Sequence, residues 1–114
     1  NRITACYLDL YTIKRMIDID PKWEKIYENS LNIIKGAKIK DTGLYKSHYE
    51  LDTRSFKTDR AISIIQSVYA LLNLAEVGEY DIEGMESCFF YLIVPLSHTE
   101  SCGILDCILG EYHP

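Results

Sequence analysis

The chain has 114 residues, of which 47% are apolar and 25% are charged, and its net charge at pH 7 is −5. This composition is typical of a globular domain rather than of a disordered segment. Lys and Arg are interspersed among the acidic residues without a basic run, which disfavours nucleic-acid binding. The longest apolar run, residues 88–94, is too short to span a bilayer. We therefore expect a single domain over residues 1–114, with no nucleic-acid partner and no membrane span.

Two helices are expected in the first third of the chain. The first runs from Thr4 to about Ile17, carries a wide apolar band, and has Thr4 as its N-cap. A polar segment then breaks it, and Asp20 caps a second helix over Pro21–Lys35, whose proline stands at the first helical position. Gly36 is well placed to end this helix in a left-handed conformation. The pattern predicts a helical hairpin.

The helical period disappears between residues 37 and 58. This stretch is interpreted as an excursion or short hairpin, with Asp52-Thr53-Arg54-Ser55 as its turn. A third helix follows over Asp59–Gly78, and it is apolar nearly all the way round. Such a helix must be covered on most sides, and a chain of this length has little left to cover it. The helix therefore indicates a piece of a larger helical assembly, or a small domain that buries a face against a partner.

The C-terminal third is ambiguous. Residues 82–94 can form a buried helix that ends before Pro95, but the run CFFYLIV within them also resembles a strand. A weak last helix is expected over Thr99–Leu109. The predicted fold class is all-α, built of helical hairpins, with a short β-like excursion between the second and third helices.

The four cysteines and the three histidines do not form a recognisable ligand set. The cysteines are scattered without a CxxC or a His-paired spacing, which disfavours a zinc site and favours buried free thiols. A bridge between Cys102 and Cys107 stays open. The chain contains no Gly-rich phosphate loop, no GxSxG elbow and no HExxH motif. We expect neither a metal nor a cofactor.

Several stretches resemble one known enzyme family. Residues 4–11 read TACYLDLY, residues 20–50 read DPKWEKIYENSLNIIKGAKIKDTGLYKSHYE, and residues 67–81 read SVYALLNLAEVGEYD. They are similar to consecutive parts of the later half of glycoside hydrolase family 8-like enzymes. The closing GILDCILGEYHP resembles a late loop of the same enzymes. That family consists of (α/α)6-barrel proteins and includes bacterial hydrolases of exopolysaccharide and cellulose systems.

The resemblance implies that the chain is part of an (α/α)-toroid. A complete barrel of the family has six helical hairpins and a much longer chain. Its general-acid Glu lies in the N-terminal half, to which no segment of this chain corresponds. The resemblance therefore implies an incomplete C-terminal portion of a larger barrel that lacks the acid and is not a competent catalyst alone.

Asp9 is the residue that the resemblance nominates for catalysis. The Tyr-x-Asp-Leu segment lies where these enzymes place an acidic residue at the barrel centre. Inverting glycosidases need a carboxylate base about 6.5–9.5 Å from a carboxylic acid, which leaves room for water. A carboxyl between Leu8 and Leu10 of an apolar helix would be desolvated, an environment that suits acid–base chemistry. The alternative is that Asp9 faces solvent or caps a helix.

Tyrosines are the candidate substrate-binding residues. Aromatic faces suit the C–H surfaces of sugar rings, and a phenol oxygen can reach hydroxyls. The residues chosen on this ground are Tyr7, Tyr11, Tyr45 and Tyr49. The alternative for the last two is that they cover an edge of the core.

Three functions remain open at this stage. The first is a glycoside hydrolase of the family 8-like type, with an oligo- or polysaccharide such as a glucan as substrate and an extracellular or cell-surface location. The second is a small acidic all-α binding protein, such as a bacterial immunity protein that blocks a toxin. The third is a helical scaffold that forms a homo-oligomer through its apolar faces.

Overall fold

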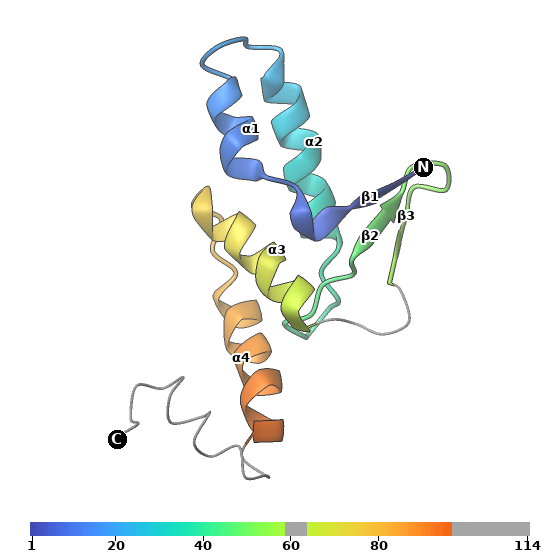
Figure 1. The fold of residues 1–114 in the computed structure, drawn as a ribbon, viewed down its shortest axis with the longest axis vertical. Helices are drawn as coiled ribbons and strands as arrows, with labels where there is room; N and C mark the ends of the chain where they lie inside the picture. Colours follow the sequence, from blue (N-terminus) through green and yellow to red (C-terminus); the bar gives the residue numbers. More distant parts are fainter. Residues whose placement is uncertain (59–63, 97–114) are drawn as a thin grey trace.

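The computed structural model describes residues 1–58 and 64–96, which form a small, mostly helical domain with a three-stranded antiparallel sheet (Figure 1). A predicted last helix over Thr99–Leu109 lies outside the described residues, as do Cys102 and Cys107. In chain order the elements are β1 (Arg2–Thr4), the 3-10 helix η1 (Ala5–Tyr7), α1 (Leu10–Met16), α2 (Trp23–Gly36), β2 (His48–Glu50), β3 (Ser55–Lys57), α3 (Ile64–Glu76) and α4 (Ile82–Leu96).

The first predicted helix is divided into three elements. Thr4 belongs to β1 and makes no side-chain capping bond, so its predicted role as N-cap is wrong. The chain turns once in η1, becomes extended at Leu8, and starts again as α1 with Asp9 as the N-cap. Sheet pairing explains the difference, because β1 engages the backbone of residues 2–4 in hydrogen bonds to β2.

The predicted second helix is confirmed as α2, although both ends differ in detail. It begins at Trp23 with Lys22 as its N-cap, so Asp20 is not the cap and Pro21 is not at the first helical position. The Asp20 carboxylate accepts a hydrogen bond from the Lys22 backbone N–H at 3.1 Å. Gly36 is not a left-handed stop, because it is the last residue of α2 and the right-handed Ala37 caps the helix. A Cβ on Gly36 would lie 2.7 Å from the ring of Phe56. Close packing against this ring, and not a positive φ, is the feature of Gly36 that the structure shows.

The excursion between α2 and α3 is a hairpin, as predicted, with residues 51–54 as its turn. The hairpin gains a third strand, since β1 pairs with β2 in the order β1-β2-β3. Tyr49 lies opposite Ile3 on one side and Phe56 on the other. The all-α prediction is thereby corrected to a mostly helical domain with a sheet. The closed toroid remains a prediction from the resemblance.

The loop between α2 and β2 passes close to both α3 and α4. The Tyr45 backbone N–H donates to the buried Ser67 hydroxyl of α3 at 2.9 Å. A Cβ on Gly43 would lie 2.2 Å from the Gly84 carbonyl oxygen and 2.4 Å from the Cys88 nitrogen. Only a residue without a side chain fits so close to the α4 backbone. The loop therefore connects the N-terminal half of the domain to α4.

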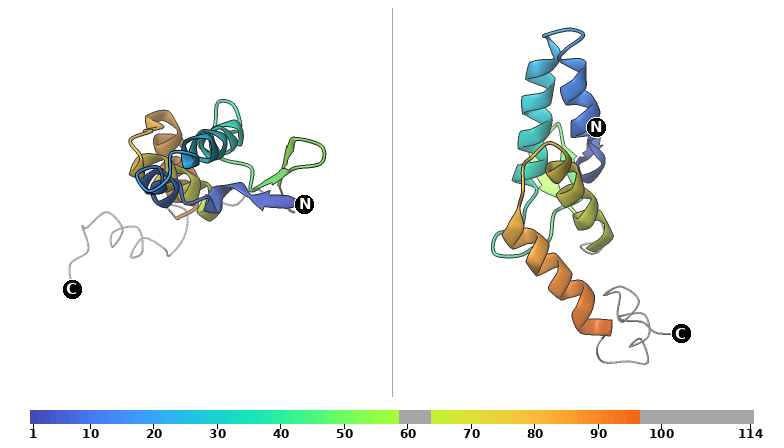
Figure 2. Two further views of the ribbon diagram at one scale, coloured as in Figure 1. Left: turned by 90° about the horizontal axis from the view of Figure 1, so that it is seen from above. Right: turned by 90° about the vertical axis from the view of Figure 1, so that its left-hand side faces the viewer.

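The ambiguous C-terminal segment is helical. α3 ends in a Schellman motif, in which the Glu79 N–H donates to Leu74 and the N–H of Gly78, at φ +80°, donates to Ala75. α4 begins four residues later and extends away from the hairpin of α1 and α2 (Figures 1 and 2). Residues 59–63, the predicted start of the third helix, lie outside the described residues.

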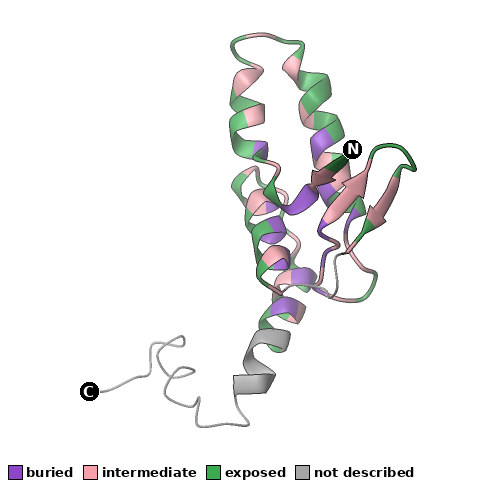
Figure 3. Cartoon of the chain, turned by 45° about the vertical axis from the view of Figure 1, so that its right-hand side comes forward, coloured by how far each residue is buried: buried purple, intermediate pink, exposed green. Residues whose placement is uncertain are grey.

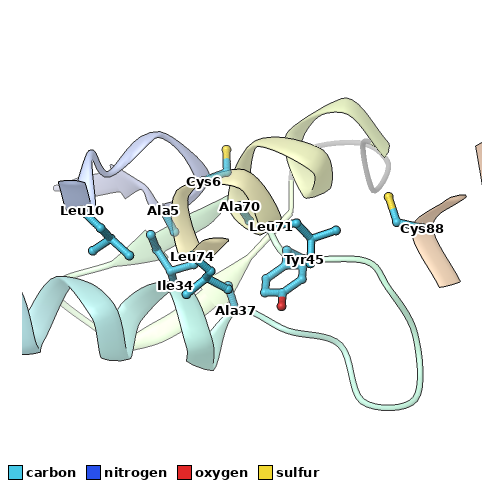
Figure 4. Close-up of a cluster of buried hydrophobic side chains, with 10 residues drawn as sticks. All are labelled: Ala5, Cys6, Leu10, Ile34, Ala37, Tyr45, Ala70, Leu71, Leu74 and Cys88. Atoms are coloured by element: carbon cyan, nitrogen blue, oxygen red, sulfur yellow. The ribbon is translucent and has the colours of Figure 1, made fainter. Parts of the chain in front are cut away.

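The core lies where η1, α2 and α3 meet, and the loop that carries Tyr45 closes it on one side (Figure 4). α3 contributes Ala70, Leu71 and Leu74, which follow one another at helical spacing. The other buried apolar residues are Ala5, Cys6, Leu10, Ile34, Ala37, Tyr45 and Cys88. Cys6 and Cys88 are free thiols, as expected, and burial raises the pKa of both.

The opposite side of α3 is apolar as well, but it is exposed (Figure 3). Ile65 is 69% exposed and Leu72 is 52% exposed, and Val68 and Tyr69 lie between them on the same face. The exposed ring of Phe89 continues this surface on α4. We call it the apolar face, and it consists of Ile65, Val68, Tyr69, Leu72 and Phe89. A groove lined by Val68, Leu71, Leu72, Met85, Cys88 and Phe89 runs along it between the two helices.

Candidate functional site

Asp9 is positioned by the start of α1. Its Oδ1 accepts from the Thr12 backbone N–H at 3.1 Å, and its Oδ2 accepts from the Thr12 hydroxyl at 2.7 Å. The side chain is exposed, so the desolvation expected for it is wrong. The physical reason is that Asp9 stands before α1, at the N-cap, and not inside an apolar helix. A carboxylate has about four lone-pair sites, so these two bonds leave it able to accept further hydrogen bonds.

Tyr7 and Tyr11 lie on either side of Asp9 in the chain, and both are exposed. The Tyr7 ring meets the Tyr69 ring of α3 edge-on, with centroids 5.4 Å apart. Tyr11 accepts a hydrogen bond from Arg15 at 3.4 Å, and the guanidinium carbon lies 5.7 Å from the ring centroid. Along the chain, an exposed carboxylate thus stands between two exposed tyrosines, each of which contacts a residue other than Asp9.

A cleft adjoins this segment between α1 and the end of α3. Tyr11, Lys14 and Arg15 line one side, and Glu76 and Val77 line the other. Its volume is about 440 Å³, within the range of about 300–1,000 Å³ that small-molecule sites have. Asp9 does not line this cleft. Asp9, the predicted base, is therefore not part of this cleft. The two are connected only by Tyr11, which lines the cleft and stands two residues after Asp9.

The other two predicted tyrosines lie elsewhere. Tyr49 is half-buried in β2, where its ring packs on Phe56 with centroids 4.9 Å apart. Tyr45 is only 2% exposed and belongs to the core. Sugar stacking requires an open ring face, which the buried Tyr45 does not offer. The structure thus brings Tyr7 and Tyr11 close to Asp9 along the chain and places Tyr45 and Tyr49 on different elements.

A second polar centre, which the sequence interpretation missed, surrounds Asp81 at the start of α4. Its Oδ2 accepts from the Tyr45 hydroxyl at 2.5 Å, and its Oδ1 accepts from Lys38 Nζ at 3.0 Å and from the Gly84 N–H at 2.9 Å. The signal available in the sequence was an Asp that precedes a helical run, which is typical of an N-cap. The sequence around Asp81 did not indicate that Tyr45 and Lys38 would be its partners.

These contacts set the electrostatics of the centre. Burial alone would raise the pKa of Asp81, but the hydrogen bonds from Tyr45, Lys38 and the Gly84 N–H outweigh it and hold the pKa below its ordinary value of 3.8. Burial, followed by the hydrogen bond to Asp81 and its negative charge, raises the pKa of Tyr45. Asp81 is therefore a carboxylate and Tyr45 a neutral hydrogen-bond donor at neutral pH. The pair suits binding and positioning rather than acid catalysis.

The Asp81 centre opens to solvent through a cleft of about 390 Å³. We call it the Asp81 cleft, and it lies between the end of α2 and the connection from α3 to α4. Its lining residues are Lys35, Lys38, Tyr45, Leu74, Gly78, Glu79, Tyr80 and Asp81. Lys35 and Glu79 form an ion pair across it.

Other site types find no support in the described part of the chain. Residues 1–58 and 64–96 contain no group of three or more His, Cys, Asp or Glu side chains that could hold a metal ion. Among the described helices, none has both the length and the apolar character needed to cross a membrane. The candidate chemistry therefore rests on Asp9, its two tyrosines and the Asp81 cleft.

Comparison with protein-family models and with curated proteins finds no match. Among solved structures, one described as a novel alpha-amylase from Clostridium perfringens matches with a TM-score of 0.69 and 31% sequence identity. The match covers 86% of this chain and 29% of the amylase chain. The chain thus resembles part of a glycosidase and spans less than a third of the length of that enzyme.

Proposed function

We propose that this chain is one helical portion of a glycoside hydrolase that cleaves a glucan or a related polysaccharide. The observation that carries the proposal is the 31% identity to part of an alpha-amylase, maintained over 86% of the chain at a TM-score of 0.69. The resemblance of residues 4–11, 20–50 and 67–81 to family 8-like enzymes supports the finer assignment to an (α/α) barrel. Both likenesses concern the same class of enzyme.

The apolar face supports the proposal that the domain functions within a larger structure. Its exposed residues lie on one side of α3 and continue on α4, and a groove runs between the two helices. Contiguous apolar surface of this kind marks an interaction site on a soluble protein. The match covers 29% of the amylase chain, so in an enzyme of that length the other 71% of the chain could cover such a face.

Asp9 is the proposed catalytic base. It is exposed, it is held by two hydrogen bonds to Thr12, and the exposed Tyr7 and Tyr11 stand two positions before and after it in the chain. In an inverting mechanism such a carboxylate takes a proton from the attacking water, while a carboxylic acid on the opposite side of the sugar protonates the leaving oxygen. The acid would come from polypeptide outside this chain. Tyr7, Tyr11 and, from the sheet, Tyr49 would provide sugar platforms.

The first test is hydrolysis. Reducing-sugar release from starch and from a panel of other α- and β-glucans is measured for this chain and for the chain extended by any coding sequence that precedes Asn1 in its gene. We expect release by the extended protein and none by this chain alone. Failure of the extended protein on every glucan would overturn the proposal, and capture of a toxin by this chain would favour the acidic binding protein instead.

The second test separates catalysis by Asp9 from capping. Asn and Ser are both good N-cap residues, so Asp9→Asn and Asp9→Ser keep the hydrogen bond to α1 and remove the carboxylate. In the extended protein we expect kcat to fall by about 10²–10⁴-fold, as for loss of a general base, while the free energy of unfolding changes by less than about 0.5 kcal/mol. Full activity in both variants would show that the base is another residue.

A further inference from the structure

The Asp81 cleft combines an apolar floor with an exposed aromatic rim. Leu74 and the ring of Tyr45 are buried beneath it. Tyr80 is 67% exposed and lines the cleft from the connection between α3 and α4. Gly78 leaves that side open, since nothing lies within 4 Å of the place where a Cβ would be. A ligand can therefore approach the ring of Tyr80 from the cleft.

The walls of the cleft are charged but balanced. Lys35 pairs with Glu79, and Lys38 lies 3.0 Å from Asp81 and 3.9 Å from Glu83. Among the described residues that line the cleft, Lys35 and Lys38 face Glu79 and Asp81, so these four charges cancel, and Glu83 lies outside the lining. An anionic ligand would gain nothing from such a site, and a cation would compete with lysines that are already in place. Neutral, hydroxyl-rich ligands fit best, because paired ammonium and carboxylate groups both donate to and accept from neighbouring hydroxyls.

We propose that the Asp81 cleft binds one or two units of a neutral oligosaccharide, with the sugar ring on Tyr80 and its hydroxyls on Lys35, Glu79 and Asp81. The site is separate from the Asp9 segment, because no residue from 7 to 11 lines this cleft. The volume of about 390 Å³ suits a small ligand. The choice of a glucan rests on the proposed function, whereas the preference for a neutral, hydroxylated ligand rests on the cleft alone.

The test is a titration of the 114-residue chain, labelled with ¹⁵N, with malto-oligosaccharides and separately with cello-oligosaccharides. We expect one of the two series to shift the amide signals of Gly78, Glu79 and Tyr80. Tyr80→Ala should weaken the affinity by about tenfold, since it removes the aromatic platform. Tyr80→Phe keeps the ring and should bind within about twofold of the wild type. Because Tyr80 is largely exposed, both variants should fold, which circular dichroism verifies.

Leu51→Ala is the control, since it removes an exposed side chain from the turn between β2 and β3 that does not line the cleft. We expect it to leave the titration at Gly78–Tyr80 unchanged. Shifts confined to residues 7–11 and abolished by Tyr11→Ala would overturn the cleft site and leave the proposed hydrolase intact. The absence of shifts with every oligosaccharide would also overturn the cleft site, and hydrolysis by the extended protein would then decide the proposed function separately. Tighter binding of a sulfated oligosaccharide than of its neutral counterpart would overturn the choice of ligand.

Discussion

The outer surface of α2, in the hairpin of α1 and α2, differs in polarity from the outer surface of α3, which packs against α4. The outer side of α2 carries Glu24, Lys25, Glu28 and Asn32, with Ile26 as an isolated exposed apolar residue. On the apolar face of α3, exposed apolar residues follow one another from Ile65 to Leu72 without an interruption by charge. The outer side of α2 is thus mainly charged and polar, whereas the apolar face has the character of an interface.

This difference shows that one helix can satisfy the local core and still present a second apolar surface. α3 places Ser67, Ala70, Leu71 and Leu74 against η1 and the loop that carries Tyr45. The rest of its circumference is what a further layer of helices would need. The comparison therefore predicts that mutations on the buried side of α3 lower the free energy of unfolding, whereas mutations on its apolar face change the binding properties of the surface. Equivalent changes at exposed positions of α2 should do neither.

The largest expected effect comes from the buried side of α3. Leu74→Ala should lower the free energy of unfolding by about 2–5 kcal/mol, because it leaves a cavity at a position that is 3% exposed. Leu72→Ala, the matched change on the apolar face, should cost less than about 1 kcal/mol in this chain. Urea unfolding monitored by circular dichroism measures both. Equal losses would show that Leu72 is already covered and would remove the contrast between the two sides.

The Asp81 centre, which connects the two regions, should give the next largest effect. Asp81→Asn removes the negative partner of Lys38 and should cost about 1–3 kcal/mol at pH 7. The pKa of Asp81 is lower in the folded than in the unfolded chain, so its stabilisation is fully present above the ordinary carboxyl pKa and is lost as the pH falls through the folded value. The difference between wild type and variant should therefore shrink at pH 3.

Glu83→Gln is the control for this measurement. Glu83 faces the same Lys38 at 3.9 Å, but its side chain is 72% exposed, and exposed ion pairs contribute little. We expect its midpoint of unfolding to match the wild type at both pH values. An Asp81→Asn variant as stable as Glu83→Gln at pH 7 would show that the Asp81 centre does not hold α4 to the rest of the domain.

The smallest effect on stability is expected when a charge is added to the apolar face. The same change tests most directly whether that face is an apolar binding surface. Leu72→Lys should change the free energy of unfolding by less than about 1 kcal/mol, while it lowers the binding of the dye ANS and any self-association at high concentration. Ile26→Lys makes the same change at an isolated exposed residue of α2 and should alter neither. A similar loss of ANS fluorescence in both variants would contradict an apolar face confined to α3 and α4.

Local signals in the sequence were sufficient for much of the fold. Period and capping predicted α2, the hairpin with its turn and the Gly78 terminus of α3, because these features depend on residues a few positions apart. They were insufficient for β1, because three residues are too few for a strand pattern to stand out and the strand depends on pairing with β2. They also misplaced Asp9, because the break at Leu8 depends on how η1 packs and not on the local period.

The sequence by itself determined that the chain is mostly helical, that its third helix is apolar on more than one side, and that Tyr7, Asp9 and Tyr11 are neighbours along the chain. Only the tertiary structure decided that Tyr45 is a core residue and that its hydroxyl meets Asp81, 36 positions away, beside Lys38, which is 43 positions from Asp81. The physical reason is the range of the interaction. Helical period and caps are local, whereas the pairing of buried polar groups is set by where the packed helices bring distant residues.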